Sequence, residues 1–184
     1  RLSGPQLAGA LAEGICAAGI DVIDIGMVPT PLSYFAAFHL GTDSAVSVTG
    51  SHNPPDYNGL KMVLGGETLA GAKIQALRSR IERGELATGA GRISRADVRD
   101  HYVERIAADV KLARPMKIAI DCGNGVAGDV APRLFRALGC AVDGLFCEVD
   151  GNFPNHHPDP SKPENLEDLI RRLRETDSEI GLAF

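Results

Sequence analysis

Hydrophobic residues along the chain recur with two alternating periods, one typical of helices and the other typical of strands. Leu7, Leu11 and Ile15 are spaced to form one face of a helix, which Gly19 would end. Residues 20–27 are instead rich in β-branched side chains, which favour a strand. Because helical and extended segments alternate to the end of the chain, the pattern predicts an α/β protein with a largely parallel sheet.

The same pattern defines the expected elements and two helix starts. Ser3 is expected to cap the first helix together with Gln6, as in a capping box. Thr30 is expected to cap the second helix, with Pro31 in its first position. The predicted helices cover residues 4–18, 31–40, 70–83, 95–111, 129–138 and 164–175, and the predicted strands cover residues 20–27, 45–49, 60–64, 117–121, 141–148 and 180–184.

Glycine and proline between residues 85 and 115 indicate a boundary between two domains. The segment 85–92 contains glycines, and Arg114-Pro115 ends the helix that follows. We therefore expect a first domain over residues 1–90, a linker helix over residues 91–115 and a second, partial domain over residues 116–184. The chain starts without a methionine and stops within an expected buried strand, so we also expect it to be part of a longer protein.

Composition and charge argue against several classes of function. The net charge is −5 and no block of lysine and arginine occurs, so we expect no nucleic-acid partner. No signal peptide and no apolar run of membrane length occurs, so we expect a cytoplasmic protein with no membrane partner. The cysteines form no C-x-x-C pair, and we expect them to be reduced and mostly in the core. They are Cys16, Cys122, Cys140 and Cys147.

The loop at residues 50–59 lies between two expected strands and contains an unusual set of side chains. Gly50 leaves room for another group to approach Ser51, and His52 is able to carry a proton. A serine hydroxyl can hold a phosphoryl group as an ester when a cation offsets the charge. Serine, asparagine, aspartate, proline and glycine are also ordinary turn residues, so composition alone leaves a purely structural loop open. The two flanking strands are expected to be neighbours in a mixed sheet.

Lys61 follows ten residues after Ser51, at the start of the next expected strand. Alternation along that strand places Lys61 on the face opposite Leu60 and Met62. If those two side chains pack inward, Lys61 points toward the loop. There its amine is suited to act as an acid or a base toward a substrate hydroxyl.

The run Ser51-His52-Asn53-Pro54, with Lys61 ten positions after the serine, resembles the phosphoserine loop of the α-D-phosphohexomutases, the family of phosphoglucomutase and phosphomannomutase. Other segments resemble that family in the same order, so the resemblance covers essentially the whole chain. These segments are Arg1-Leu2-Ser3-Gly4, Gly26-Met27-Val28-Pro29-Thr30-Pro31, Asp121-Cys122-Gly123-Asn124-Gly125 and Asp150-Gly151-Asn152-Phe153-Pro154. The resemblance implies mixed sheets sandwiched by helices, in domain 1 without its N-terminal portion and the first part of domain 2 of a four-domain enzyme.

The resemblance also implies a role for each residue of the loop. Ser51 would carry the phosphoryl group, Lys61 would be the general acid and base, and His52 would lie close to the transferred group. Lys61 and Asn53 would contact the phosphosugar substrate. Mg²⁺ would bind the Ser51 phosphate and three aspartates of an Asp-Gly-Asp-Gly-Asp loop beyond Phe184. The implied reaction interconverts the 1-phospho and 6-phospho forms of mannose or glucose through hexose 1,6-bisphosphate. The chain alone is expected to be inactive, and the oligomeric state is not implied.

Three other functions stay open at this point. Within the family, the alternative is a phosphoglucosamine mutase. Gly123, Gly125 and Gly128 match the G-x-G-x-x-G pattern between a strand and a helix, which would indicate a nucleotide-binding oxidoreductase domain. The acidic residue that this pattern requires does not fit well, because Asp143 falls near the start of the next strand rather than at its end. A non-catalytic phosphosugar-binding module is the third possibility.

The adjacent His156 and His157 suggest a metal site, because histidine is a common ligand. Adjacent side chains in an extended loop point in opposite directions, however, so they rarely share one metal. We therefore expect the polar loop at residues 150–163 to lie at a domain interface or near the substrate.

Overall fold

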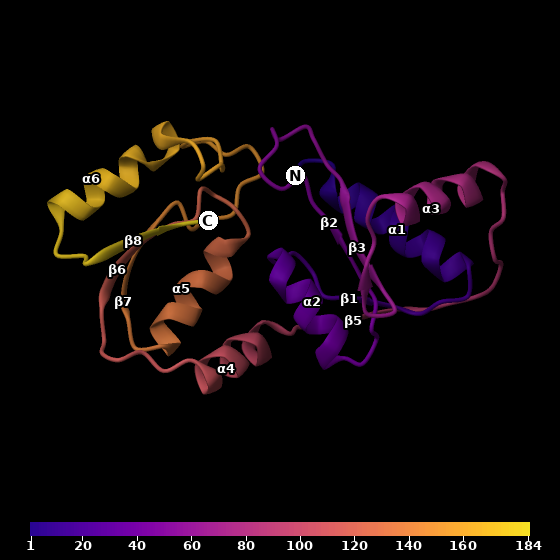
Figure 1. Ribbon diagram of the computed structural model, residues 1–184, viewed down its shortest axis with the longest axis horizontal. Helices are drawn as coiled ribbons and strands as arrows, with labels where there is room; N and C mark the ends of the chain where they lie inside the picture. The colour runs from indigo at the N-terminus through magenta and orange to yellow at the C-terminus, as the bar shows by residue number, and fades with distance from the viewer.

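The computed structural model describes all residues from Arg1 to Phe184 and divides them into two units that lie side by side (Figure 1). The first unit (residues 1–95) contains α1 (Gly4–Ala17), β1 (Val22–Asp24), α2 (Thr30–His39), β2 (Ala45–Val48), β3 (Leu60–Leu64), β4 (Glu67–Thr68), α3 (Ala72–Glu82) and β5 (Ile93–Arg95). The second unit (residues 99–184) contains α4 (Arg99–Asp109), β6 (Lys117–Asp121), α5 (Ala127–Ala137), β7 (Ala141–Leu145), the 3₁₀ helix η1 (Pro163–Leu166), α6 (Glu167–Glu175) and β8 (Ile180–Ala183). Helices and strands alternate in the second unit, whereas β2, β3 and β4 follow one another in the first unit. Both units combine helices with strands, which confirms the predicted α/β class.

The strands of the first unit form two small sheets. β2, β3 and β4 are antiparallel neighbours in that order, which confirms that the strands flanking the loop at residues 50–59 are paired. Their sheet is antiparallel throughout, however, and not mixed as predicted. β1 pairs in parallel with β5, a strand that was not predicted. All three residues of β5 are exposed, so its short sequence lacks the apolar alternation by which strands are recognised.

Ser3 occupies the predicted N-cap position of α1 but does not make the predicted capping interaction, and the predicted cap of the second helix is wrong. Ser3 stands directly before α1, but its φ and ψ of −81° and −2° are those of a helix and its side chain makes no capping hydrogen bond. The Ser3 hydroxyl instead accepts a hydrogen bond of 3.1 Å from the Asn58 side chain. α2 begins at Thr30 itself, and the residue before it is Pro29, which has no side chain able to cap.

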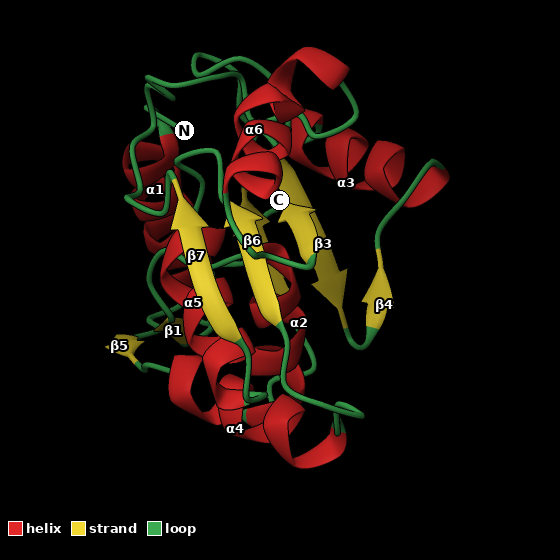
Figure 2. Ribbon diagram, turned by 90° about the vertical axis from the view of Figure 1, so that its left-hand side faces the viewer, coloured by secondary structure: helices red, strands yellow, loops and turns green.

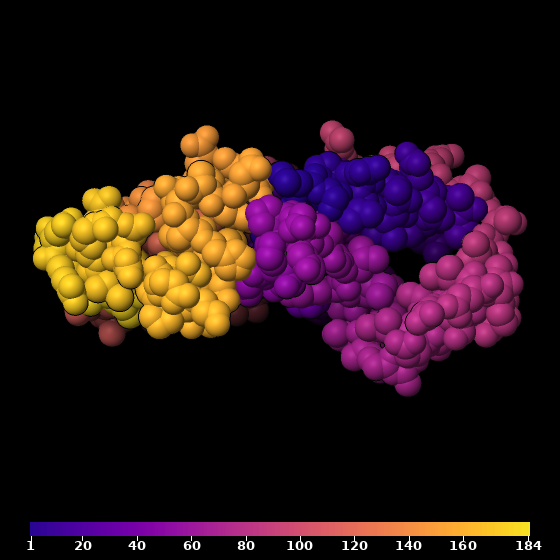
Figure 3. All heavy atoms as spheres, turned by 90° about the horizontal axis from the view of Figure 1, so that it is seen from above, coloured from indigo at the N-terminus to yellow at the C-terminus, as the bar shows by residue number.

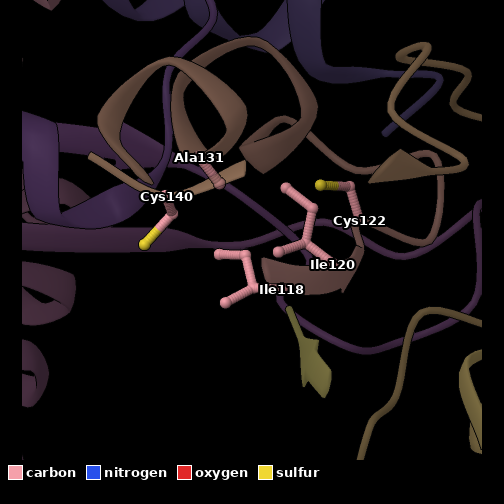
Figure 4. Packing of buried hydrophobic residues seen from close by; sticks show 5 residues of the cluster. All are labelled: Ile118, Ile120, Cys122, Ala131 and Cys140. Carbon is pink, nitrogen blue, oxygen red and sulfur yellow. The ribbon is translucent and has the colours of Figure 1, made fainter. Parts of the chain in front are cut away.

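The sheet of the second unit is parallel throughout, with the strand order β7-β6-β8, as the pattern predicts. Four of the five residues of β6 are buried, since helices cover both faces of the sheet (Figure 2). Ile118 and Ile120 pack with Ala131 of α5 on one face (Figure 4). Ala119 packs with Leu169 of α6 on the other face. This alternation along β6 places the main core of the protein in the second unit.

The two units are joined by an apolar cluster rather than by a free linker. Leu32 and Ala36 of α2 pack with Val130 of α5 and with Val98, which directly precedes α4. Val98 is 1% exposed. The segment at residues 91–115, expected as a linker helix, is therefore divided between a strand of the first unit and a helix that packs on α5.

Two further expectations concern cysteine and membrane association. All four cysteines are free, and Cys122 and Cys140 are buried while Cys16 and Cys147 are partly exposed. Cys147 packs against the core cluster that contains Cys122 and Cys140, so three of the four lie in or against the core and none forms a disulfide, as predicted. None of the helices combines the length and the apolar content that crossing a bilayer requires.

Candidate active site

The loop that carries Ser51 is built by hydrogen bonds within itself. The Thr49 amide donates to the Gly59 carbonyl at 2.9 Å and closes the base of the loop. Inside the loop, the backbone amide and the side-chain amide of Asn53 both donate to the Gly50 carbonyl, at 3.0 and 2.9 Å. The Asn53 side chain therefore shapes the loop, and its contact with a substrate stays a prediction.

Ser51 itself has an unusual backbone conformation. Its φ is +52°, in the left-handed region that non-glycine residues avoid at a cost of about 1–2 kcal/mol. The Ser51 amide donates to the Thr49 hydroxyl at 3.0 Å, which helps to hold this conformation. The side chain is exposed. Strained residues that a surrounding network holds in place are concentrated at functional sites, so the strain favours a chemical role for Ser51.

Gly50 and Arg1 lie against each other beside the serine. A Cβ atom on Gly50 would lie 2.6 Å from the Tyr57 carbonyl oxygen and 2.7 Å from the Arg1 Nε, so only glycine fits. Arg1 donates to the Ser51 carbonyl, and its guanidinium lies 4.5 Å above the centre of the Phe153 ring. Its Nη1 atom is buried without a hydrogen-bond partner. Reasoning from local sequence missed Arg1, whose place is fixed by contacts with residues far along the chain.

Lys61 is exposed on β3, where its backbone pairs with Ser47 of β2. Leu60 is 48% exposed, so the condition that Leu60 and Met62 both pack inward is not met. The packing argument therefore no longer supports the expectation that Lys61 points toward the loop. Its role as acid and base stays a prediction.

The second unit contacts the serine loop through two hydrogen bonds that involve His52. The His52 Nδ1 atom lies 2.6 Å from the Pro158 carbonyl oxygen, and the His157 Nε2 atom lies 2.7 Å from the His52 carbonyl oxygen. Both acceptors are carbonyl oxygens, so the His52 Nδ1 atom and the His157 Nε2 atom must each carry the hydrogen of their bond. The polar loop at residues 150–163 is thus an interface loop, as predicted.

His156 points away from its neighbour and contacts Asp121 at the end of β6. Its Nε2 lies 2.9 Å from an Asp121 carboxylate oxygen, and its Nδ1 lies 3.0 Å from the His157 carbonyl oxygen. Burial alone would lower the pKa of His156, but the acceptors beside its two nitrogens outweigh burial, so the pKa is raised above its ordinary value. Asp121 is 1% exposed and also accepts from the Gly123 amide at 2.8 Å.

These contacts leave no metal site of the kind that adjacent histidines suggest. His156 and His157 bind different partners, and no three histidine, cysteine, aspartate or glutamate side chains converge on one point. The residues of this chain therefore do not fit a Mg²⁺ site on their own. The contribution of Ser51 to such a site, through its phosphate, stays a prediction.

The glycines of the G-x-G-x-x-G loop have structural roles. A Cβ atom on Gly128 would lie 1.9 Å from the Cys147 carbonyl oxygen, and Gly123 has a φ of +49°. The Asn124 side chain is buried in the same loop and donates to the Glu148 carbonyl at 2.9 Å. Because the chain itself requires these glycines, their spacing no longer favours a nucleotide-binding domain.

Comparison with known families and structures identifies the family to which the chain belongs. The family profile "Phosphoglucomutase/phosphomannomutase, alpha/beta/alpha domain I" matches residues 1–88, and the profile for domain II of the same family matches residues 100–184. The chain therefore belongs to the phosphoglucomutase/phosphomannomutase family, whose members include the phosphohexomutases that the loop resembles.

Individual relatives show how much of such a protein the chain represents. It is 56% identical over 184 residues to a phosphomannomutase/phosphoglucomutase of Pseudomonas aeruginosa and spans 40% of that protein's length. It is 38% identical to a Methanothermobacter thermautotrophicus protein named "Probable phosphoglucosamine mutase", of which it spans 42%. A crystal structure of a family member from Burkholderia thailandensis superposes with a TM-score of 0.96 at 58% identity, covering all of this chain and 42% of that one.

Proposed function

We propose that Ser51 carries a phosphoryl group that it exchanges with a hexose phosphate, so that the protein containing this chain is a phosphohexomutase. The observation that carries the proposal is the exposed Ser51 at φ +52°, held by hydrogen bonds within a loop that the second unit also contacts. A rigid loop presents the serine oxygen in one place, which is what transfer between positioned oxygens requires. The names of the relatives support this reaction.

In the first half of the proposed reaction, a free hydroxyl of the hexose phosphate attacks the phosphorus atom of phosphoserine 51. The bond between phosphorus and the serine oxygen breaks, which yields a hexose 1,6-bisphosphate and a serine oxygen that leaves without a proton. Lys61, in its neutral form, takes the proton of the attacking hydroxyl and returns one in the second half. In that half the unprotonated serine oxygen attacks the other phosphate group, and the bond between that phosphorus and the sugar oxygen breaks. The sugar oxygen takes the proton from Lys61, so the sugar leaves with its phosphate moved.

Arg1 is suited to offset part of the phosphate charge. It lies against the Ser51 backbone, and its buried Nη1 atom lacks a partner. A guanidinium that retains an unpaired donor favours an anionic ligand. We propose no step that depends on a metal ion, since the ligands expected for Mg²⁺ belong to a segment beyond Phe184.

The substrate that we propose is a phosphate of mannose or glucose. The phosphoglucosamine mutase alternative is less well supported, because the relative with that name is 38% identical, against 56% for the phosphomannomutase/phosphoglucomutase. A purely structural phosphosugar-binding module would never carry a covalent phosphate. Ser51 in phosphorylated form therefore distinguishes the enzyme from the binding module.

The test uses the full-length enzyme, by which we mean this chain together with the further length that its relatives have. Ser51→Ala is expected to abolish almost all mutase turnover and to remove the mass of one phosphoryl group from the intact protein. Ser79→Ala, in the middle of α3, is the matched control and should change neither. Undiminished turnover in Ser51→Ala would contradict the proposal, as would failure of the wild-type protein to take up phosphate from a hexose bisphosphate.

A further inference from the structure

The contact between His52 and residues 157–158 is reciprocal. His52 donates through its side chain to the second unit, and the second unit donates through the His157 side chain to the His52 backbone. The two bonds, at 2.6 and 2.7 Å, clamp both the ring and the peptide group of one residue. Because His52 directly follows Ser51, this clamp acts on the loop next to the proposed phosphoryl carrier.

The clamp also determines which nitrogen of His52 is free. A carbonyl oxygen only accepts hydrogen bonds, so the Pro158 carbonyl requires a hydrogen atom on His52 Nδ1. Neutral imidazole carries one hydrogen, so Nε2 is then left with a lone pair and becomes a donor only when the ring is protonated. His52 is an exposed residue, so Nε2 is the nitrogen available to a group outside the loop.

The second half of the clamp is itself held rigidly. Pro158 is buried, and the ring of proline restricts its φ. It lies beside Gly123, where a Cβ atom would come within 3.3 Å of the Pro158 Cβ. The Asp159 amide donates to the His157 carbonyl at 2.8 Å, and His156 is bound to Asp121. The acceptor and the donor that His52 uses therefore have little freedom to move.

We propose that His157 and Pro158 are positioning residues: together they hold His52 in the tautomer with hydrogen on Nδ1, so that Nε2 faces the phosphoryl group carried by Ser51. This inference rests on the phosphoryl transfer proposed for Ser51. The phosphoryl transfer proposed above gives the His156-His157-Pro158 run no role. The present inference gives it one, which is to position His52 for that transfer. His157 acts through His52 and does not touch the sugar.

The experiment compares two substitutions of His157 in the full-length enzyme that differ in one property. Glutamine retains a side-chain N–H donor, whereas leucine has a similar size and no donor. His157→Leu is expected to lower kcat about 10- to 100-fold with a small change in KM, because a misplaced catalytic group slows chemistry more than binding. His157→Gln should recover most of that loss. His101→Leu, on the exposed surface of α4, is the matched control and should leave kcat unchanged.

A second measurement reads the tautomer directly and does not depend on turnover. In protein labelled with ¹⁵N-histidine, the nitrogen signals of His52, assigned by their loss in His52→Asn, should show hydrogen on Nδ1 in the wild type. His157→Leu should give a mixture of the two tautomers. A single Nδ1–H tautomer and an unchanged kcat in His157→Leu would overturn the positioning role. Undiminished turnover in Ser51→Ala would instead overturn the proposed function and leave the tautomer result standing.

Discussion

The two units of this protein differ in how their strands are held. In the second unit, β6 has four buried residues out of five, between helices on both faces. In the first unit, β2 and β3, which flank the serine loop, have no buried residue. α1 and α3 have none either, and Figure 3 shows an opening between these two helical segments. The loop that carries Ser51, the proposed phosphoryl carrier, therefore lies on the less buried unit.

This difference shows where the rigidity of the serine loop originates. Burial of apolar surface contributes about 25 cal/mol per Å², and β2 and β3 bury little. The loop depends instead on its own hydrogen bonds and on contacts with the second unit, among them those of His52 with Pro158 and His157. The second unit is thus the support on which the loop of the first unit is positioned.

The largest expected effect on stability comes from truncating an apolar side chain, and we compare this truncation in the two units. Ile120→Ala, at a position with 0% exposure, should lower the free energy of unfolding by about 2–5 kcal/mol, because it leaves a cavity in the main core. Leu64→Ala, at a position with 44% exposure at the end of β3, should cost less than about 1 kcal/mol. Urea denaturation of both variants measures the difference. Equal losses would show that the hairpin is as well packed as the core sheet.

A smaller effect is expected from adding a methyl group to a helical glycine in each unit. Gly128→Ala should destabilise the protein by about 1–3 kcal/mol, since the new Cβ atom would overlap the Cys147 carbonyl. Gly9→Ala, in α1 with no atom within 4 Å of its new Cβ, should stabilise it by about 0.5–1 kcal/mol. Thermal unfolding of the two variants should shift Tm in opposite directions. Tm shifts of the same sign would contradict the inference that the first unit is less closely packed than the second.

The smallest effect concerns pH and the pair of His156 and Asp121. The pKa of His156 is raised in the folded protein, so the pair stabilises fully below the pKa of an unfolded histidine, about 6.5. That stabilisation is lost as the pH rises through the raised folded pKa. The difference in unfolding free energy between wild type and His156→Gln should therefore shrink as the pH rises above about 6.5. His101→Gln is the control, and a difference that grows with pH would contradict the assignment.

Much of this architecture could be predicted from local sequence. β6 has the predicted bounds, because a strand buried on both faces is a continuous apolar run. The bounds of the Ser51 loop could be predicted for a similar reason, since strands with clear ends flank it. β4 and β5 were missed because two or three exposed residues carry no period.

Contacts between distant residues were beyond reach of the local pattern. His52 and Pro158 are separated by 106 positions, and their hydrogen bond depends on how the two units meet. The place of Arg1 beside Gly50 is decided in the same way. Only the general location of the loop at residues 150–163 could be predicted, because a long polar segment between buried elements has to lie at a surface or an interface.

The return of the chain to β5 before α4 has a mechanical consequence. A hinge needs a segment whose dihedral angles can change without breaking contacts. Here the crossing between the units is fastened at one end by the pairing of β5 with β1 and at the other by the cluster around Val98. Bending at this junction would break the hydrogen bonds between β5 and β1 or expose the side chain of Val98 to solvent. The two units should therefore move together as one rigid body.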